Sequence, residues 1–426
     1  MTVSTAGSRE LRLAALADEL RADAANGLHY GSDEGDRQRW IRIRGLAAAL
    51  LSHVDVRSAS EIESVFAGDA GPRTPLIAVV LMLNDQRDGL LFLNNGDSVG
   101  TPYAYVDVHS DHETAVRRLA AQLLPDEEVM PVPHGICDSV SAGLAVPHTY
   151  FLTYVVDVTL VDRASITAEL IPEADTVPGR RDALTNYIMG GAQRDVLEAP
   201  FALTDATADL VAEADRLAQR GLAATTDPFD TERYGRISQT AQSLLEGVRN
   251  QTPFGPARFA HLDTRTPKTC AELLILDEKR RILLLRRHDN GKWAMPGGAC
   301  EVGETSAATA ARETAEEVLL DATVDGLAGV FHNDLVGDRA AQLHTCFVYV
   351  GHPTDIGAEP STSAEAVEVG WFELAALDDL SDLWEPHRAK IIGALKTIVE
   401  LAARYRTERT NKVTRSGDGN DLHLVM

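Results

Sequence analysis

The stretch from Gly298 to Leu320, GACEVGETSAATAARETAEEVLL, places three carboxylates and an arginine on a short predicted helix directly after a glycine-rich turn. Glu313, Glu316 and Glu317 are spaced i, i+3 and i+4, so they share one face of that helix. Their like charges would repel each other unless a cation neutralised them. Several oxygen ligands suit Mg²⁺ or Mn²⁺, whereas zinc prefers histidine and cysteine. The stretch therefore predicts a metal site that handles phosphates.

The residues before this face set the start of the helix. Glu304 precedes Glu313 by nine positions, half a turn out of phase, so we expect it in the loop or the first turn. Thr305 or Ser306 is the expected N-cap of a helix that runs to about Leu320. A solvated helix with an acidic stripe is the alternative, and an EE pair alone would favour it. The full set of spaced charges favours the metal site.

The spacing G-x5-E-x7-R-E, followed by a second glutamate pair, resembles the box of the Nudix hydrolases at the glycine and at every charged position. The resemblance implies that Glu316 and Glu317 bind the metal directly and that Glu313 completes the site, directly or through water. Thr314 stands where the family has an aliphatic residue, and Leu319 where it usually has glycine. We therefore expect altered helix packing or a different exit turn, with the chemistry kept.

The same resemblance implies roles around the box. The turn of Gly297 and Gly298 lets the backbone approach the metal, and the carbonyl of Gly298 is an implied ligand. Arg312 is implied to orient a helix carboxylate, and Glu304 completes the box. The proton of the attacking water goes either to a box glutamate or to Glu365, which precedes an E-x-x-W-F pattern. A surface glutamate in a flexible loop is an equal alternative for Glu365.

Several residues upstream of the box are candidates for contacts to the substrate. Arg286, Arg287 and Lys292 could meet phosphates, although basic residues at strand ends are more often only solvated. Trp293 could stack on a base, but packing at the edge of the sheet is the favoured alternative. The N-G-x-W and P-G-G patterns here also resemble Nudix enzymes.

An internal repeat organises the rest of the chain. Residues 10–52 and 207–246 both have the pattern of a helical hairpin, and Trp40 aligns with Tyr234. Apolar strands and an H-T-x-F pattern follow each hairpin at an offset of about 191 to 196 residues. The repeated unit is therefore a helical hairpin together with a whole Nudix-like domain.

The first copy lacks the charged residues of the box. In the aligned register, Ala121 and Gln122 stand in place of Arg312 and Glu313. Pro125 falls within the helix that should present the remaining ligands, where proline removes a hydrogen bond. We expect the first copy to be catalytically inactive and the chain to hold one metal site.

The predicted class is α+β, with two Nudix-type α/β/α sandwich domains, each with a mixed sheet and each preceded by a small helical hairpin domain. The predicted boundaries are residues 8–65 for the first hairpin, 70–195 for the degenerate Nudix-like domain, 203–255 for the second hairpin, 264–404 for the catalytic Nudix domain and 405–426 for a disordered tail.

Composition excludes several classes. The chain of 426 residues carries 64 acidic and 40 basic side chains, and its net charge of −24 argues against a nucleic-acid surface. The four cysteines are too scattered for a disulfide framework or a zinc site, so we expect reduced thiols. The N-terminus lacks a signal-peptide core, and the apolar run at residues 76–83 is too short to span a membrane. We expect a cytoplasmic protein.

The pattern GLxxxxDxxDxxRY at residues 221–234 resembles the N-terminal domain of Nudix proteins associated with CDP-choline and ADP-ribose pyrophosphatases. This implies a Mg²⁺-dependent pyrophosphohydrolase that cleaves a nucleoside diphosphate linked to a second moiety into a nucleoside monophosphate and a phosphorylated product. The alternatives are a non-catalytic nucleotide sensor and a hydrolase that sanitises nucleoside triphosphates. The expected assembly is an intramolecular pseudo-dimer, with a homodimer as the other option.

Overall fold

In the computed structural model of the protein, the chain forms two compact units. The first consists of Met1–Pro267 with Glu301–Gly303, and the second of Lys268–Cys300 with Glu304–Met426. The structure describes residues 8–413 except 32, 70, 97, 145, 163–165, 177–179, 189–201, 260, 335–342, 356 and 378.

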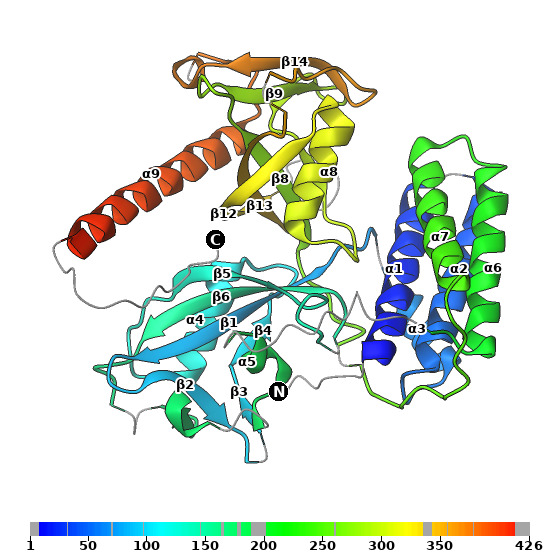
Figure 1. Cartoon of the computed structure of the whole chain (residues 1–426), viewed down its shortest axis with the longest axis horizontal. Helices are drawn as coiled ribbons and strands as arrows, with labels where there is room; N and C mark the ends of the chain where they lie inside the picture. The colour runs from blue at the N-terminus through cyan, green and yellow to red at the C-terminus, as the bar shows by residue number, and fades with distance from the viewer. Residues whose placement is uncertain are drawn as a thin grey trace. The chain divides into compact units, whose positions relative to one another are not determined.

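Four helices of the first unit pack around one hydrophobic core. Leu13, Trp40, Val211 and Ile237, one from each helix, belong to a single buried cluster. Figure 1 shows the two helices from the beginning of the chain alongside the two from its middle. The two predicted hairpins therefore share a core and are not separate domains. The helices are α1 (Ser8–Tyr30), α2 (Glu34–Ser52), α6 (Asp205–Leu222) and α7 (Pro228–Leu245).

The centre of this bundle has a local two-fold pattern. The rings of Trp40 and Tyr234 stack with centroids 4.1 Å apart and planes within 2°. A Cβ atom at Gly27 would lie 2.2 Å from the Trp40 ring, and one at Gly221 would lie 2.4 Å from the Tyr234 ring. The Tyr234 hydroxyl also donates to Asp36 Oδ1 at 2.9 Å. The repeated glycines are thus explained by the close approach of an aromatic ring in each hairpin.

The first unit also contains a mixed sheet with the strand order β3-β2-β1-β6-β5, in which β4 pairs with β1 and β7 with β2. Its central strand is a continuous apolar run that is almost entirely buried. The strands are β1 (Leu76–Asp85), β2 (Gly89–Asn94), β3 (Val99–Gly100), β4 (Tyr103–Tyr105), β5 (Val132–Asp138), β6 (Thr149–Asp157) and β7 (Leu170–Pro172). The helices beside this sheet are α4 (His112–Leu123), α5 (Ala183–Ile188) and the short 3₁₀ helix η2 (Glu173–Asp175), whereas α3 (Ala59–Phe66) packs with the helical bundle through Ile62 and Phe66.

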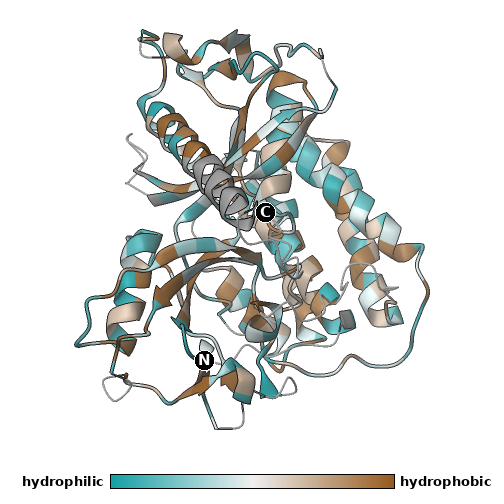
Figure 2. Ribbon diagram, turned by 60° about the vertical axis from the view of Figure 1, so that its left-hand side comes forward, coloured by the Kyte–Doolittle hydropathy of each residue, from teal (hydrophilic) through white to brown (hydrophobic). Residues whose placement is uncertain are grey.

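The second unit has a four-stranded sheet of order β11-β8-β13-β12 and a three-stranded sheet of order β10-β9-β14. Helix α8 packs on β8 and β11, while α9 packs on β12 and β13. Hydrophobic and hydrophilic residues alternate along the coloured part of α9 (Figure 2), as expected for a helix with one buried face. The elements are β8 (Lys268–Ile275), β9 (Ile282–Arg287), β10 (Trp293–Ala294), β11 (Gly297–Ala299), α8 (Ser306–Val318), β12 (Ala322–Asp334), β13 (Leu343–Pro353), β14 (Ala366–Phe372), η4 (Leu374–Ala376) and α9 (Glu385–Val413).

The two mixed sheets have the same core topology. In the first, β4 is antiparallel to β1, β1 is parallel to β6, and β6 is antiparallel to β5. In the second, β11 is antiparallel to β8, β8 is parallel to β13, and β13 is antiparallel to β12. The predicted α+β class with mixed sheets is confirmed.

The structure corrects the alignment of the two helices that follow β4 and β11. Helix α4 ends at Leu123, so Pro125 lies beyond it and does not interrupt it. Both helices start from a side-chain cap, Asp111 for α4 and Thr305 for α8. Counted from these caps, Leu119, Gln122 and Leu123 occupy the positions of Glu313, Glu316 and Glu317. The first helix therefore lacks all three carboxylates, and Pro125 plays no part in this.

The C-terminal helix is longer than expected. Helix α9 continues to Val413, so the prediction of disorder is wrong for residues 405–413. The physical reason is that no glycine or proline occurs between Ala394 and Val413, and helix propagation is cooperative. The remainder of the predicted tail, residues 414–426, lies outside the described residues.

The four cysteines are free thiols in the structure. Within the described ranges, no helix combines the length and the apolarity that crossing a membrane requires.

A buried ion pair lies on the face of β8 that contacts α9. Lys390 Nζ donates to Glu272 Oε1, and the two side chains are only 2% and 7% exposed. His387 Nδ1 lies 3.5 Å from Glu272 Oε2, and Cys346 Sγ lies 3.7 Å from Lys390 Nζ. Burial lowers the pKa of His387 to about 4, so Lys390 is the cation that balances Glu272.

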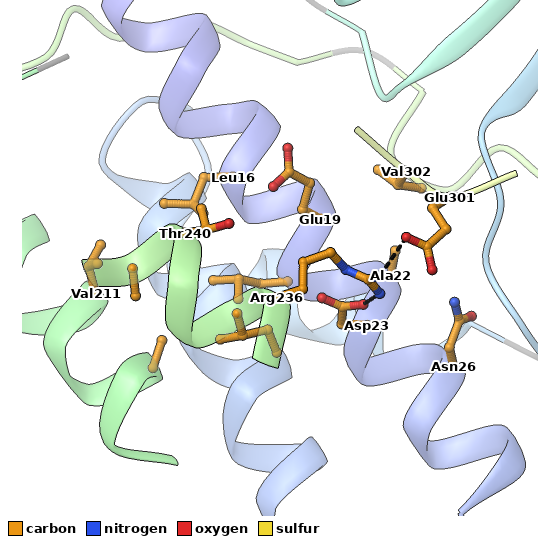
Figure 3. A pocket seen from close by; sticks show the side chains of 14 residues that line it. Leu16, Glu19, Ala22, Asp23, Asn26, Val211, Arg236, Thr240, Glu301 and Val302 are labelled. Carbon is orange, nitrogen blue, oxygen red and sulfur yellow. Dashed lines mark hydrogen bonds and ion pairs between the residues drawn. The ribbon is translucent and has the colours of Figure 1, made fainter. Parts of the chain in front are cut away.

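A small polar cluster lies in a pocket of the first unit, beside α1 and α7 (Figure 3). The Arg236 guanidinium forms ion pairs of 2.6 Å with Asp23 and with Glu301. Burial and the neighbouring Asp23 charge raise the pKa of Glu19, in the same pocket, to about 8. Arg236 therefore balances Asp23 and Glu301, with Glu232 as a third and longer partner at 3.3 Å, and Glu19 holds its proton at neutral pH.

Replacing Glu19 by glutamine is expected to stabilise the protein at pH 9 and to change little at pH 5. Because the pKa of Glu19 is raised from about 4.5 to about 8 by folding, its favourable contribution is complete below pH 4.5 and lost as the pH rises through 8. Glutamine mimics the protonated form. We expect a gain of about 1–3 kcal/mol at pH 9 in urea unfolding, with exposed Glu128→Gln as the control. An equal effect at both pH values would contradict this.

Candidate active site

Arg312 lies at the centre of the box carboxylates. Its Nη2 donates to Glu304 Oε1 at 2.8 Å, and its Nη1 donates to Glu313 Oε1 at 3.0 Å and to Glu316 Oε2 at 2.9 Å. Thr309, one turn into α8, adds a hydroxyl that donates to Glu304 Oε1 at 2.7 Å. One guanidinium thus orients three carboxylates, two from α8 and one from the loop that precedes it.

The two glycines that were expected in a turn lie in the strand β11 and contact Glu317 and Glu313 of the box. The backbone N–H of Gly297 donates to Glu317 Oε2 at 2.8 Å. A Cβ atom at Gly298 would lie 2.5 Å from the carboxylate carbon of Glu313, so a side chain at this position would displace that carboxylate. Gly297 itself has φ of 152° and its Cβ would lie 2.4 Å from the carbonyl of Ala271. The backbone of β8 therefore requires glycine at position 297, whereas Gly298 leaves the space beside β11 that the Glu313 carboxylate occupies.

The electrostatics of the cluster favour a cation. Burial raises the pKa of Glu313 to about 7, against the lowering effect of Arg312 and with a further rise from Glu316. Burial and the Glu313 charge raise the pKa of Glu317 to about 8, although the Gly297 N–H opposes this. Since all available donors are carboxylate and carbonyl oxygens, the cluster fits a hard divalent cation such as Mg²⁺ or Mn²⁺.

Helix α8 begins and ends at caps. Thr305 is the N-cap, and its hydroxyl accepts from the N–H of Ala308 at 3.2 Å. Thr314, which replaces an aliphatic residue, is buried and donates to the carbonyl of Ala310 at 2.8 Å. Leu319 has φ of 52° and ψ of 40°, the left-handed conformation that glycine usually supplies at a helix end. The expected different exit turn is therefore not seen: Leu319 takes the conformation that glycine usually supplies, at the cost of backbone strain.

Replacing Leu319 by glycine is expected to stabilise the protein by about 0.5–1 kcal/mol. The left-handed conformation costs an L-residue about 1–2 kcal/mol, part of which glycine loses again through its greater freedom in the unfolded chain. Little burial is lost, because Leu319 is 56% exposed. Urea denaturation measures the change. Leu319→Ala keeps the strain and is the matched control, so equal stability of the two variants would refute the explanation.

Arg287 is held near the cluster. Its Nε and Nη2 donate to the two oxygens of Asp289 at 2.9 and 2.8 Å, and its guanidinium lies 5.3 Å from the centre of the Trp384 ring. The hydrogen bonds to Asp289 raise the pKa of Arg287 most, and the charges of Glu317 and Glu365 raise it further, so these two carboxylates lie within electrostatic reach. Sequence reasoning missed Asp289 and Trp384. The HDNGKW turn could have suggested Asp289, but Trp384 comes from a distant segment.

The other predicted substrate contacts are engaged elsewhere or exposed. Arg286 Nε donates to the carbonyl of Gly291 at 2.8 Å, within its own hairpin turn. Trp293 packs edge-on against Phe372 at 4.8 Å and belongs to the apolar cluster beside α9. Lys292 is exposed. The structure thus brings Arg287, rather than Arg286 or Trp293, into the electrostatic environment of α8.

Glu365 lies in the loop just before β14. It is exposed, its N–H donates to Ser363 Oγ at 3.1 Å, and its carbonyl accepts from the N–H of His288 at 3.0 Å. Its charge contributes to the raised pKa values of Glu313 and Glu317. The loop therefore brings a solvated carboxylate close to the box, as a proton acceptor would require.

Comparison with known proteins agrees with this arrangement. Residues 267–395 match the family model of the NUDIX domain. A MutT-like protein of Streptomyces ambofaciens is 33% identical over 123 residues, which are 29% of this chain and 73% of that protein. The chain belongs to the Nudix family. The predicted family and the predicted class, a hydrolase of pyrophosphate bonds, are confirmed.

Two further relatives match parts of this Nudix chain. The CMP-5'-(N-acetyl-N-hydroxy-3-aminopropyl)phosphonate hydrolase of Streptomyces rubellomurinus is 30% identical over 166 residues, 38% of this chain and 76% of that protein. The ADP-ribose pyrophosphatase of Methanocaldococcus jannaschii is 32% identical over 110 residues, which are 25% of this chain and 63% of the pyrophosphatase. Residues 12–66 match the model of the UDP-X-like, N-terminal oligomerisation domain.

Proposed function

We propose that the protein is a Mg²⁺-dependent or Mn²⁺-dependent Nudix pyrophosphohydrolase that acts on a nucleoside diphosphate linked to a second moiety, of the CDP-choline or ADP-ribose type. The products are a nucleoside monophosphate and a phosphorylated second product. The observation that carries the proposal is the cluster on α8, in which Arg312 and the Gly297 N–H orient the box glutamates. Relatives that act on a CMP phosphonate and on ADP-ribose support the substrate class.

The cation would be held by Glu313, Glu316 and Glu317, with the carbonyl of Gly298 as a further oxygen donor. When bound, such a cation neutralises phosphate charge and lowers the pKa of a coordinated water. The fit rests on the donor chemistry and on the raised pKa values of Glu313 and Glu317, which a positive charge would lower.

The side chains of the chain supply positioning and proton transfer. Arg312 keeps the glutamates in place, and Arg287 offers a guanidinium to a phosphate of the substrate. Water attacks one phosphorus of the anhydride, the bridging P–O bond breaks, and the leaving phosphate departs. The proton of the water goes to Glu365 or to a box glutamate, the two acceptors that the geometry leaves open.

A substrate panel tests the proposal. Release of a nucleoside monophosphate from ADP-ribose, CDP-choline, a UDP-sugar and an oxidised nucleoside triphosphate is followed by chromatography with and without Mg²⁺. Turnover of a linked nucleoside diphosphate supports the proposal, and preference for the triphosphate would favour a sanitising hydrolase. Binding without any turnover would favour a nucleotide sensor.

We also propose that the chain is a tandem duplication that forms an intramolecular pseudo-dimer. The support is the shared strand order of the two sheets, the shared core of the two hairpins, and the oligomerisation-domain model that matches residues 12–66. The first copy, which has Leu119, Gln122 and Leu123 in the ligand positions, would be inactive. Titration calorimetry should then show one metal-binding site per chain, and analytical ultracentrifugation should show a monomer. Two metal-binding sites per chain would contradict the proposal. A homodimer that loses activity when it dissociates into single chains would also contradict it.

A further inference from the structure

A pocket of about 340 Å³ lies in the first unit between α1, α2 and the end of α3. Its lining includes His29 from α1, Arg37, Ile41 and Arg44 from α2, and Phe66 from α3. None of these residues belongs to the proposed catalytic machinery on α8. The pocket is therefore separate from the site described above.

Two arginines converge on this pocket without partners. Arg37, Ile41 and Arg44 are spaced i, i+4 and i+7, so they share one face of α2. Across the part of the chain that the structure describes, neither guanidinium makes a hydrogen bond or an ion pair, and the Nε of Arg44 is buried without an acceptor. A buried guanidinium N–H without an acceptor is costly. Because the chain has 64 acidic and only 40 basic side chains, an arginine left without a carboxylate is unexpected.

The carboxylate of Asp69 also lines the pocket, but it is already paired with Arg21. Both oxygens of Asp69 accept from Arg21, whose Nε and Nη2 each donate at 2.7 Å. Asp69 therefore leaves the charges of Arg37 and Arg44 available to a ligand. Apolar side chains, including Leu28 and Ile41, form the remaining wall.

The second hairpin does not repeat this feature. In the register that aligns Trp40 with Tyr234, Thr231 and Ser238 stand in place of Arg37 and Arg44. The Ser238 hydroxyl donates to Asp215 Oδ1 at 2.6 Å, so the side chain at this position already has a hydrogen-bond partner within the protein. The two arginines are a property of the first hairpin and are not needed to build a hairpin of this kind.

We propose that this pocket binds a phosphate-bearing small molecule, with phosphate oxygens that accept from the guanidinium groups of Arg37 and Arg44. Guanidinium groups suit this task because their N–H donors match the spacing of phosphate oxygens. The apolar wall contacts the rest of the ligand when that ligand is a nucleotide. The proposal is independent of the catalytic assignment, since it uses no residue of α8.

Isothermal titration calorimetry on the full chain tests the site with two probes, inorganic phosphate and cytidine monophosphate. The Glu316→Gln/Glu317→Gln background and a buffer with EDTA remove metal-dependent binding at α8. We expect one saturable site per chain, with affinity that falls as NaCl is raised. Arg44→Gln should weaken binding of the probe about ten- to a hundredfold, which is the usual effect of losing a charge-assisted hydrogen bond. The double variant Arg37→Gln/Arg44→Gln should abolish binding.

The control variant is Arg87→Gln, which removes an exposed arginine of the same unit and should leave affinity unchanged. Thermal unfolding without ligand checks that each variant folds, and the ligand-induced rise of the midpoint gives a second readout. Tighter binding of the nucleotide than of phosphate identifies a nucleotide site, and equal binding identifies a phosphate site. Failure of both probes to saturate, or unchanged affinity in the double arginine variant, would overturn the proposal.

Discussion

Replacing Glu317 by glutamine is expected to lower kcat/KM by at least about a hundredfold, the scale on which enzymes lose rate when a group that stabilises transition-state charge is removed. Glutamine keeps the size of the side chain and can still accept from the Gly297 N–H. It removes the negative charge that a divalent cation needs. The loss should therefore appear in turnover and in metal affinity together, measured by product release and by titration calorimetry.

The pH dependence separates this loss from unfolding. The pKa of Glu317 is raised from about 4.5 to about 8, so its contribution to stability is complete below pH 4.5 and lost as the pH rises through 8 in the metal-free protein. Metal-free Glu317→Gln should be at least as stable as the natural protein at pH 9, although inactive. Exposed Glu278→Gln is the matched control and should keep full activity. Normal turnover of Glu317→Gln would exclude Glu317 from the metal site.

Replacing Lys390 by methionine is expected to destabilise the protein by about 3–5 kcal/mol, the cost of leaving one member of a buried ion pair without its partner. Lys390 is 2% exposed and Glu272 is 7% exposed, so water cannot replace the missing ammonium group. In the natural protein, burial and the neighbouring Lys390 charge lower the pKa of His387 to about 4, so Lys390 is the group that carries the positive charge beside Glu272. Urea or thermal unfolding of the full chain measures the loss.

A second substitution makes this prediction specific. Lys390→Met combined with Glu272→Met should recover most of the lost stability, because a buried ion pair can often be exchanged for apolar side chains. The exposed pair Arg117–Glu113, with side chains 66% and 53% exposed, is the control, and Arg117→Met should cost less than about 1 kcal/mol. If Lys390→Met lowered the free energy of unfolding by no more than Arg117→Met does, then Lys390 would not be needed to stabilise the buried charge of Glu272.

The candidate site was largely predictable because most of it lies on one helix. The spacing of Arg312, Glu313, Glu316 and Glu317 determines which side chains share a face, since an α-helix turns by a fixed angle at each residue. The structure adds that Glu304 reaches the same guanidinium from the preceding loop. The contacts between segments were not predictable in this way, because nothing in the local pattern near Arg287 points to Trp384.

The sequence by itself determined the family, the mixed α+β class, the two hairpins and the charged face of α8, because each depends on local spacing or on a repeat that can be aligned. Only the tertiary structure decided that both hairpins share one core around Trp40 and Tyr234, and that Lys390 balances Glu272 from 118 residues away. It also decided that Leu319 takes a left-handed conformation. An amphipathic pattern predicts which face of a helix is buried, but it does not predict which other segment packs against that face. Only the tertiary packing determines that segment.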